Sequence, residues 1–225
     1  GYLDAIRNVF TTGGTHTDVR PNAEQLERIN HMYVQDREVE KVTKDDGAEK
    51  EVIKKWTFDT DLEGWTVAKW MGRDMDVRDL QQKNGCMTGT AIMNAGKNDP
   101  NYSDAALNPP ENAGPWSANE VAQIRVRMKL SVATDAPELY FSTEASPSLG
   151  QDKLVIGSYN QKNADANGFV EVVFDMSSSA SWKGTITGFR LDPMTKPGSF
   201  EIDSVELLGK KDLSEAIVTM EGTRI

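Results

Sequence analysis

The clearest candidate for chemistry, by residue type and spacing, is the acid Asp203. It lies in the run 200–207, in which apolar and polar residues alternate. Alternation in a strand places Asp203 on the same face as Val205 and Leu207, so its carboxylate is predicted to point toward a core. A buried carboxylate without a partner is very costly, so a cation is expected beside it. The alternative is a β-bulge at Ser204 that turns Asp203 out to solvent.

A second acid, Asp59, follows the aromatic residues Trp56 and Phe58 near the start of the same region. The first and last strands of a sandwich are commonly neighbours, so Asp59 and Asp203 could share one ion. Calcium suits such a site because it accepts carboxylate and carbonyl oxygens. The sequence therefore predicts a structural Ca²⁺ held by these two acids.

Nucleophilic chemistry has few residues to draw on. Cys86 is the single cysteine, and we interpret it as a small buried thiol. The two histidines, His16 and His31, both lie near the N-terminus, so a Ser–His or Cys–His system would need that segment. The chain has 35 acids, so carboxylate pairs suited to a glycosidase are easily found, but spacing marks none of them. We therefore expect no enzyme.

The charge of the chain argues against some partners. Its formal net charge is -10, which repels phosphate backbones and makes nucleic acid a poor partner. No stretch of the sequence approaches the about 20 apolar residues that a membrane-spanning helix needs. We expect neither a nucleic-acid partner nor a membrane span.

The elements that must position these residues are short strands. In the run 124–130, apolar residues alternate with the cations Arg125, Arg127 and Lys129, which predicts a strand with one buried and one solvated face. Gly, Pro, Asn and Asp separate this run from others like it. We predict an all-β fold, an antiparallel β-sandwich of the jelly-roll type, with its other strands at 51–58, 64–71, 85–93, 138–142, 153–159, 168–175, 185–191 and 199–208.

Three regions are predicted along the chain. Residues 1–50 form a helical segment and linker, because Leu26, Ile29 and Met32 fall on one helical face. Residues 51–209 form the β-sandwich. Residues 210–225 are a C-terminal extension or the start of a following domain. Because the chain does not begin with Met, we expect it to be a piece of a longer protein.

Four segments carry a resemblance to a known family. They are WTFDTDLEGW, IRVRMKL, VVFDMSSSASWKGTITGFRLDP and FEIDSVELL. Together they resemble the galactose-binding-like jelly rolls, and among these the bacterial carbohydrate-binding modules attached to polysaccharide-degrading enzymes and cell-surface proteins. The resemblance covers about residues 51–209 and implies the sandwich. It also implies a structural calcium, because an acid after the first strand's aromatic and the Asp of the closing strand match Asp59 and Asp203.

The resemblance turns attention to residues that could bind a sugar. Sugar recognition needs aromatic faces and polar groups that form paired hydrogen bonds. Trp70 is the preferred platform because it lies on the opposite strand face from Trp65, which is expected in the core with Trp56. Trp182 is expected to be structural. The candidate ligand-binding residues are Trp70, Arg73, Arg125, Arg127, Tyr102 and Trp116.

Three functions are compatible with these features of the sequence. The first is a noncatalytic carbohydrate-binding module of a secreted or cell-surface bacterial protein, with a polysaccharide or glycan and neighbouring domains as partners. The second is a structural spacer domain with the same fold and no sugar site. The third is a polysaccharide lyase or hydrolase, which a cleft holding two acids with shifted pKa values would favour. We expect the first.

Overall fold

The computed structural model of the chain describes residues 50–210. The predicted helical segment and C-terminal extension lie outside the described residues, and the predicted domain boundaries stay predictions. Within residues 50–210 the fold is all-β with antiparallel pairing, as predicted. Three short 3₁₀ helices interrupt the strands, η1 (Gln151–Lys153), η2 (Gln161–Asn163) and η3 (Met176–Ser178). No helix in this part of the chain is long and apolar enough to cross a membrane.

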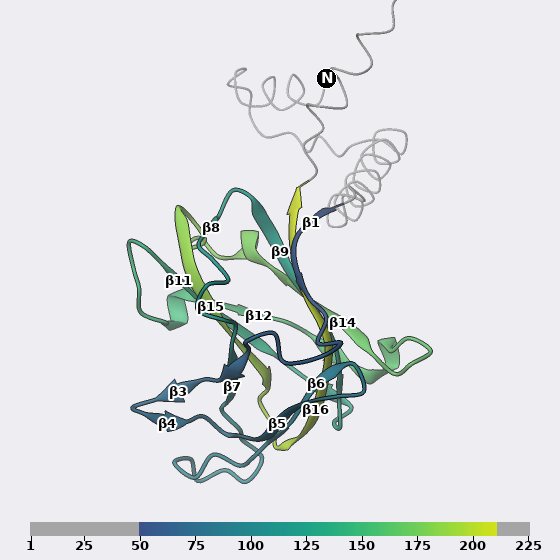
Figure 1. Ribbon diagram of the computed structural model, residues 1–225. Coiled ribbons are helices and arrows are strands. Elements are labelled where there is room, and N and C mark those ends of the chain that lie inside the picture. Colours follow the sequence, from purple (N-terminus) through teal and green to yellow (C-terminus); the bar gives the residue numbers. More distant parts are fainter. Residues whose placement is uncertain (1–49, 211–225) are drawn as a thin grey trace, which may run out of the picture. The chain divides into compact units, whose positions relative to one another are not determined.

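The first large sheet, sheet A, contains both ends of the described chain (Figure 1). Its strand order is β14-β9-β16-β6-β5. The long closing strand β16 pairs with β9 on one edge, and with β6 and then β1 on the other. The strands are β1 (Lys50–Trp56), β5 (Val77–Lys83), β6 (Cys86–Ala91), β9 (Val121–Leu130), β14 (Val170–Asp175) and β16 (Gly198–Lys210).

The second large sheet, sheet B, has the order β12-β11-β15-β7-β2, and β8 also pairs with β15. Its strands are β2 (Thr66–Val67), β7 (Ala105–Asn108), β8 (Trp116–Ser117), β11 (Glu138–Thr143), β12 (Leu154–Ile156) and β15 (Thr185–Met194). Two small ladders complete the fold, β3 (Lys69–Trp70) with β4 (Arg73–Asp74) and β10 (Thr134–Asp135) with β13 (Tyr159–Asn160).

The two sheets share one hydrophobic core. On β9 the apolar residues Ile124, Val126 and Met128 are fully buried, as the alternating pattern predicts. Sheet B contributes Phe141 and Leu191 to the same cluster. Two antiparallel sheets packed face to face over a common core make a β-sandwich. Each sheet therefore keeps one outer face on which polar side chains can gather.

The predicted strands match the structure wherever apolar and polar residues alternate clearly. Where this alternation is weak, strands were missed or their bounds were wrong. The structure adds β5, β7 and β8, which the sequence analysis missed. In β5 most residues are polar and only Val77 is fully buried, and β7 begins with alanines of low strand propensity. The strand predicted at 64–71 is broken into β2 and β3, because the second part leaves sheet B to form a hairpin with β4.

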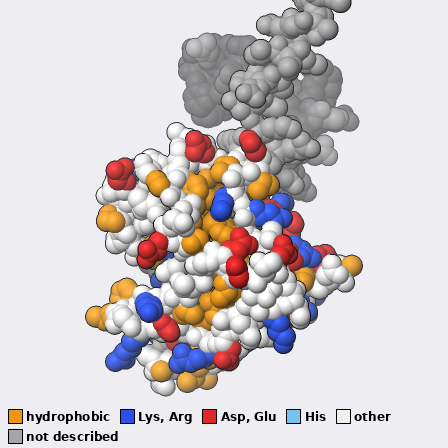
Figure 2. Space-filling view, in the orientation of Figure 1, with side chains coloured by type: hydrophobic (Ala, Val, Ile, Leu, Met, Phe, Trp, Pro, Cys, Tyr) orange, Lys and Arg blue, Asp and Glu red, His pale blue; other side chains and the backbone are white. Residues whose placement is uncertain are grey.

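Charged side chains of both signs are spread over the surface. Figure 2 shows Lys and Arg interspersed with Asp and Glu over the visible face of the described part, with hydrophobic atoms between them. Interspersed charges of this kind suit solubility. The sign of the charge therefore does not single out a functional area on this face.

Candidate functional site

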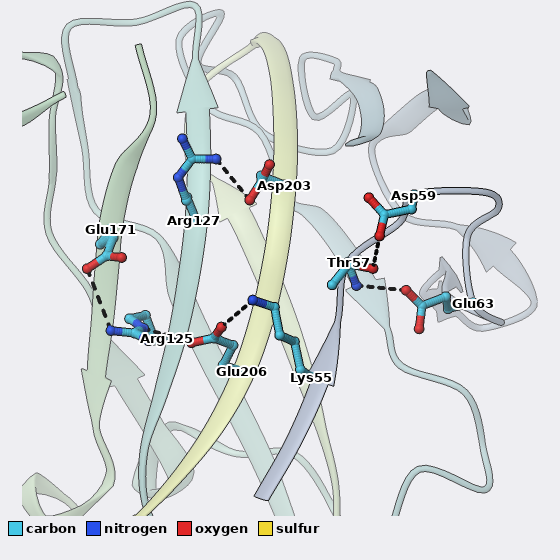
Figure 3. Close-up of polar contacts among 9 residues, drawn as sticks. All are labelled: Lys55, Thr57, Asp59, Glu63, Arg125, Arg127, Glu171, Asp203 and Glu206. Carbon is cyan, nitrogen blue, oxygen red and sulfur yellow. Dashed lines mark hydrogen bonds and ion pairs between the residues drawn. The ribbon is translucent and has the colours of Figure 1, made fainter. Parts of the chain in front are cut away.

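The prediction that Asp203 points into the core is wrong. The pairing of β16 with β9 shifts between Ile202 and Ser204, so the alternative of a bulge at this point is the one observed. The bulge directs Asp203 to the outer face of sheet A. There its Oδ2 atom lies 2.9 Å from Nη1 of Arg127, and its side chain is 36% exposed (Figure 3).

The other predicted calcium ligand, Asp59, lies in the loop after β1. Its Oδ2 atom accepts a hydrogen bond of 2.7 Å from the Thr57 hydroxyl. The backbone carbonyls of Phe58 and Asp59, which could otherwise bind an ion, accept hydrogen bonds of 3.1 Å from the Gln82 side-chain amide. Glu63 accepts from the backbone N–H groups of Thr57 and Phe58.

These contacts do not fit an ion shared by Asp59 and Asp203. In Figure 3 the Asp203 carboxylate points to Arg127, while Asp59 points to Thr57. A cation beside Asp203 would also meet the fixed positive charge of Arg127. In the described part of the chain, no group of three or more His, Cys, Asp and Glu could hold a metal ion. Calcium binding therefore stays a prediction, with Asp59 as its remaining ligand.

Arg125 and Arg127, two of the candidate ligand-binding residues, face outward on sheet A and are both ion-paired. Arg127 contacts Asp203 and also Asp165, at 2.5 Å. Arg125 lies 2.5 Å from Glu206 and 3.8 Å from Glu171.

The pKa of Glu206 is lowered, because hydrogen bonds from Lys55 and Arg125 outweigh the burial that acts to raise it. The outer face of sheet A thus carries a set of ion pairs that neutralise one another. We call it the charge ladder, and its members are Lys55, Arg125, Arg127, Asp165, Glu171, Asp203 and Glu206.

The outer face of sheet B contains a buried ion pair that the sequence analysis missed. Nε and Nη2 of Arg190 donate to the two carboxylate oxygens of Asp192 at 2.7 and 2.6 Å. The side chains are 13% and 5% exposed. The guanidinium of Arg190 also lies 4.5 Å from the ring centroid of Tyr140, which pairs with it across the β11–β15 ladder.

Hydrogen bonds extend this pair across sheet B. The Tyr140 hydroxyl donates to Glu138 at 3.0 Å and accepts from the Gln151 amide at 3.1 Å. Burial and the hydrogen bond to Glu138 raise the pKa of Tyr140 to about 12. The phenol therefore stays protonated and acts as a hydrogen-bonding group. We call these five residues, Glu138, Tyr140, Gln151, Arg190 and Asp192, the sheet-B cluster.

Acids outnumber cations around the sheet-B cluster. Burial raises the pKa of Asp192 to about 7, although Arg190 acts to lower it and Asp104 and Glu138 add to the rise. Burial also raises the pKa of Asp104. Two such acids on one face are the feature that favours a hydrolase. Because both oxygens of Asp192 are held by Arg190, however, this carboxylate is not placed to donate a proton or to attack a substrate.

Trp70 lies on a hairpin that is anchored to the sheet-B face. The residue is 69% exposed, and Arg73 is its partner in the β3–β4 ladder. At the base of the hairpin, Ala68 donates its backbone N–H to Ala106 of β7. Met75, at the other side of the base, packs with these two alanines and contacts Nη1 of Arg190 through its sulfur at 3.8 Å. The hairpin therefore rises from the edge of the sheet-B cluster.

Tyr102 lies in the loop between β6 and β7. Lys97 places its Nζ atom 5.3 Å from the Tyr102 ring centroid. Burial raises the pKa of Tyr102, and Asp104, Glu138 and Asp192 raise it further. The next residue, Ser103, donates its backbone N–H to the carbonyl of Thr195 just after β15, so this loop lies beside sheet B.

Trp116 occupies the far end of sheet B. It is half-buried on β8 and packs against Phe189, with ring centroids 5.9 Å apart. It also lines a pocket of about 370 Å³.

Four of the six candidate ligand-binding residues thus belong to the sheet-B side, namely Trp70, Arg73, Tyr102 and Trp116. The other two, Arg125 and Arg127 of β9, belong to sheet A.

The sequence contained a signal for the ion pair that was missed. In the run Phe189-Arg190-Leu191-Asp192, alternation puts Arg190 and Asp192 on the outer face.

No protein-family model and no curated protein matches the chain. Among solved structures, "BiXyn10A CBM1 APO" has 12% sequence identity and a TM-score of 0.45, with 70% of this chain and 98% of that chain covered. The module CBM28, specific for non-crystalline cellulose, has 15% identity and a TM-score of 0.43 over 65% of this chain and 88% of its own.

Catalytic domains also resemble the chain. The laminarinase from Flavobacterium sp. UMI-01 has 10% identity and a TM-score of 0.43, with 70% of this chain and 100% of that chain covered. Carbohydrate-binding modules and glucanase jelly rolls are thus among the similar structures, in agreement with the predicted resemblance. At TM-scores this low, the likenesses carry no argument about what this chain binds or does.

Proposed function

We propose that this chain contains a noncatalytic glycan-binding module, part of a secreted or cell-surface bacterial protein with further domains. The observation that carries the proposal is the position of Trp70. An exposed indole on a hairpin whose base is anchored to sheet B offers the apolar face that a pyranose ring needs. The base of this hairpin lies beside the sheet-B cluster, so an aromatic surface and hydrogen-bonding side chains lie next to each other.

The sheet-B cluster suits binding better than reaction. Its donors and acceptors are held in place by one another, so little conformational entropy is lost when a ligand meets them. Tyr140 stays protonated, and Asp192 is tied to Arg190. Glu138 and Gln151, the more exposed members of the cluster, can orient the hydroxyls of a glycan, whereas general acid–base catalysis by Asp192 would need its 5% exposed carboxyl to be open to the substrate.

The charge ladder on sheet A favours a second function, that of a spacer domain. Its ion pairs leave a face studded with mutually neutralised charges, as expected where a domain separates others without holding a ligand. A glycan array probed with the whole chain, with and without Ca²⁺, distinguishes the two. Binding to a defined group of polysaccharides supports the module, and a folded chain that binds none supports the spacer.

Calcium stabilisation remains part of the proposal, with Asp59 as the ligand. An ion that binds the folded chain alone raises stability by about 2.7 kcal/mol at a hundredfold excess over its Kd. We therefore expect EDTA to lower the melting temperature, and Asp59→Asn to abolish this response. Asp203→Asn is the matched control and should keep the response, because Asp203 pairs with Arg127. Identical melting temperatures with and without EDTA would contradict calcium binding.

A further inference from the structure

A pocket of about 370 Å³ lies at one end of sheet B, apart from the Trp70 hairpin. It is lined by residues of the segment from Asn108 at the end of β7 to Trp116 at the start of β8, and by Thr187, Gly188 and Phe189 of β15. Trp116, Pro109 and Pro110 are among the residues that line it. The volume is at the lower end of the range typical of ligand pockets, about 300–1,000 Å³, so it has room for a small rigid group.

The floor of the pocket is a gap in the sheet. On this edge of β15, Ile186 pairs with Trp116 of β8, and Leu191 pairs with Leu107 of β7. Between them, in the described part of the chain, residues 187–190 have no pairing partner on this edge. An unpaired strand edge presents backbone donors and acceptors, so the pocket offers hydrogen-bonding groups that are fixed by the sandwich.

The chemistry of the walls defines the ligand. An indole and two prolines provide apolar surfaces, while Thr66, Asn108 and Glu111 provide hydroxyl, amide and carboxylate groups. A sugar ring has the matching character, with apolar faces and an edge of hydroxyls. The charge of Glu111 disfavours an anionic sugar. A neutral ring fits, and the small volume favours one ring over a run of several.

We propose that this pocket binds a single neutral pyranose, as the end of a glycan chain, and so forms a second binding site separate from the Trp70 platform. The inference rests on the proposed function for the class of ligand and on the pocket for the position. It assigns Trp116 as the stacking residue and the open edge of β15 as the hydrogen-bonding edge.

Gly188 offers a way to fill the pocket without removing its walls. A Cβ atom added there would meet only the Ser142 hydroxyl, at 3.6 Å, so a larger side chain is compatible with the strand. Gly188→Val should therefore fold and occupy the space meant for the ring. Val173→Ala is the matched control, because Val173 is exposed on β14 of sheet A.

The test is an NMR titration of the whole chain with glucose, galactose, mannose, xylose and N-acetylglucosamine. The readout is the indole N–H signal of Trp116, assigned with Trp116→Phe. We expect at least one sugar to shift this signal, with an affinity at least tenfold weaker in Gly188→Val and unchanged in Val173→Ala. A Trp116 signal that no sugar moves, or a shift that Gly188→Val leaves intact, overturns the pocket.

The two proposals fail in different ways. Array binding that persists while Trp116 stays silent overturns the pocket and leaves the module. An empty array contradicts the module as proposed, whereas a sugar-dependent shift at Trp116 that Gly188→Val removes would still support the pocket.

Discussion

Replacing Arg190 with Met should lower the free energy of unfolding by about 3–5 kcal/mol at pH values near 8, because it leaves a buried carboxylate without its partner. Arg190 holds both oxygens of Asp192, whose side chain is 5% exposed. Methionine keeps much of the packing volume of the arginine stem but supplies no donor. The loss is measured by urea unfolding of both proteins.

This loss should depend on pH, and its sign follows from the pKa of Asp192. Burial already raises that pKa to about 7 in the folded chain, and removing Arg190 takes away the influence that lowers it. A carboxyl with a raised folded pKa contributes stability at pH values below its unfolded pKa, and that stability is lost as pH rises through the folded pKa. The deficit of Arg190→Met should thus be about 1.4 kcal/mol larger near pH 8 than near pH 5, where Asp192 is protonated, because pH 8 lies about one unit above the pKa of about 7.

A double variant separates the ion pair from the rest of the site. The single variant leaves the Asp192 carboxylate buried without a partner. Replacing both residues, as Arg190→Met with Asp192→Leu, removes this carboxylate and should recover much of the lost stability. A single variant that is as stable as the wild type at both pH values would contradict the described pairing.

Trp70→Ala should weaken glycan binding at least tenfold, which corresponds to about 1.4 kcal/mol, because the exposed indole is the proposed stacking platform. The folded state should be little affected, since most of this side chain already meets solvent. Isothermal titration with the strongest glycan from the array measures the change in affinity, and thermal melting checks the fold.

Two other residues serve as controls for Trp70. Val173→Ala removes an exposed hydrophobic side chain from the opposite sheet and should bind as the wild type does. Trp182 donates its Nε1 hydrogen to the carbonyls of Ala118 and Val121 and packs edge-on against Phe141. Trp182→Ala should therefore lower stability while the folded fraction still binds. An unchanged affinity in Trp70→Ala would contradict the proposal that the Trp70 indole stacks on the glycan.

The strands could be predicted from the sequence wherever one face is apolar and the other charged. In β9 the alternation of Arg125 and Arg127 with buried residues fixed both the strand and its solvated face. The burial of Trp56 and Trp65 in the core and the exposure of Trp70 also agree with the prediction. Period-two alternation is a local property, so local reasoning is sufficient for it.

The site was less predictable, because it depends on register and on pairs that are distant in sequence. Asp203 was placed on the wrong face because a single bulge reverses every side chain after it. The packing of Arg190 on Tyr140 joins residues from β15 and β11, which no spacing within one segment reveals. Arg127 was considered for a ligand, but its ion pairs to Asp165 and Asp203 come from two other parts of the chain.

The ligand is proposed to meet the outer face of sheet B, and backbone NMR shifts on adding the glycan that binds best on the array measure directly which face it contacts. We predict changes at 66–76 and 102–108 and along residues 138–142 and 187–192, with the β9 and β16 amides at 125–129 and 201–206 left in place. The reverse pattern, with the amides of the charge ladder moving and those of sheet B silent, would contradict it.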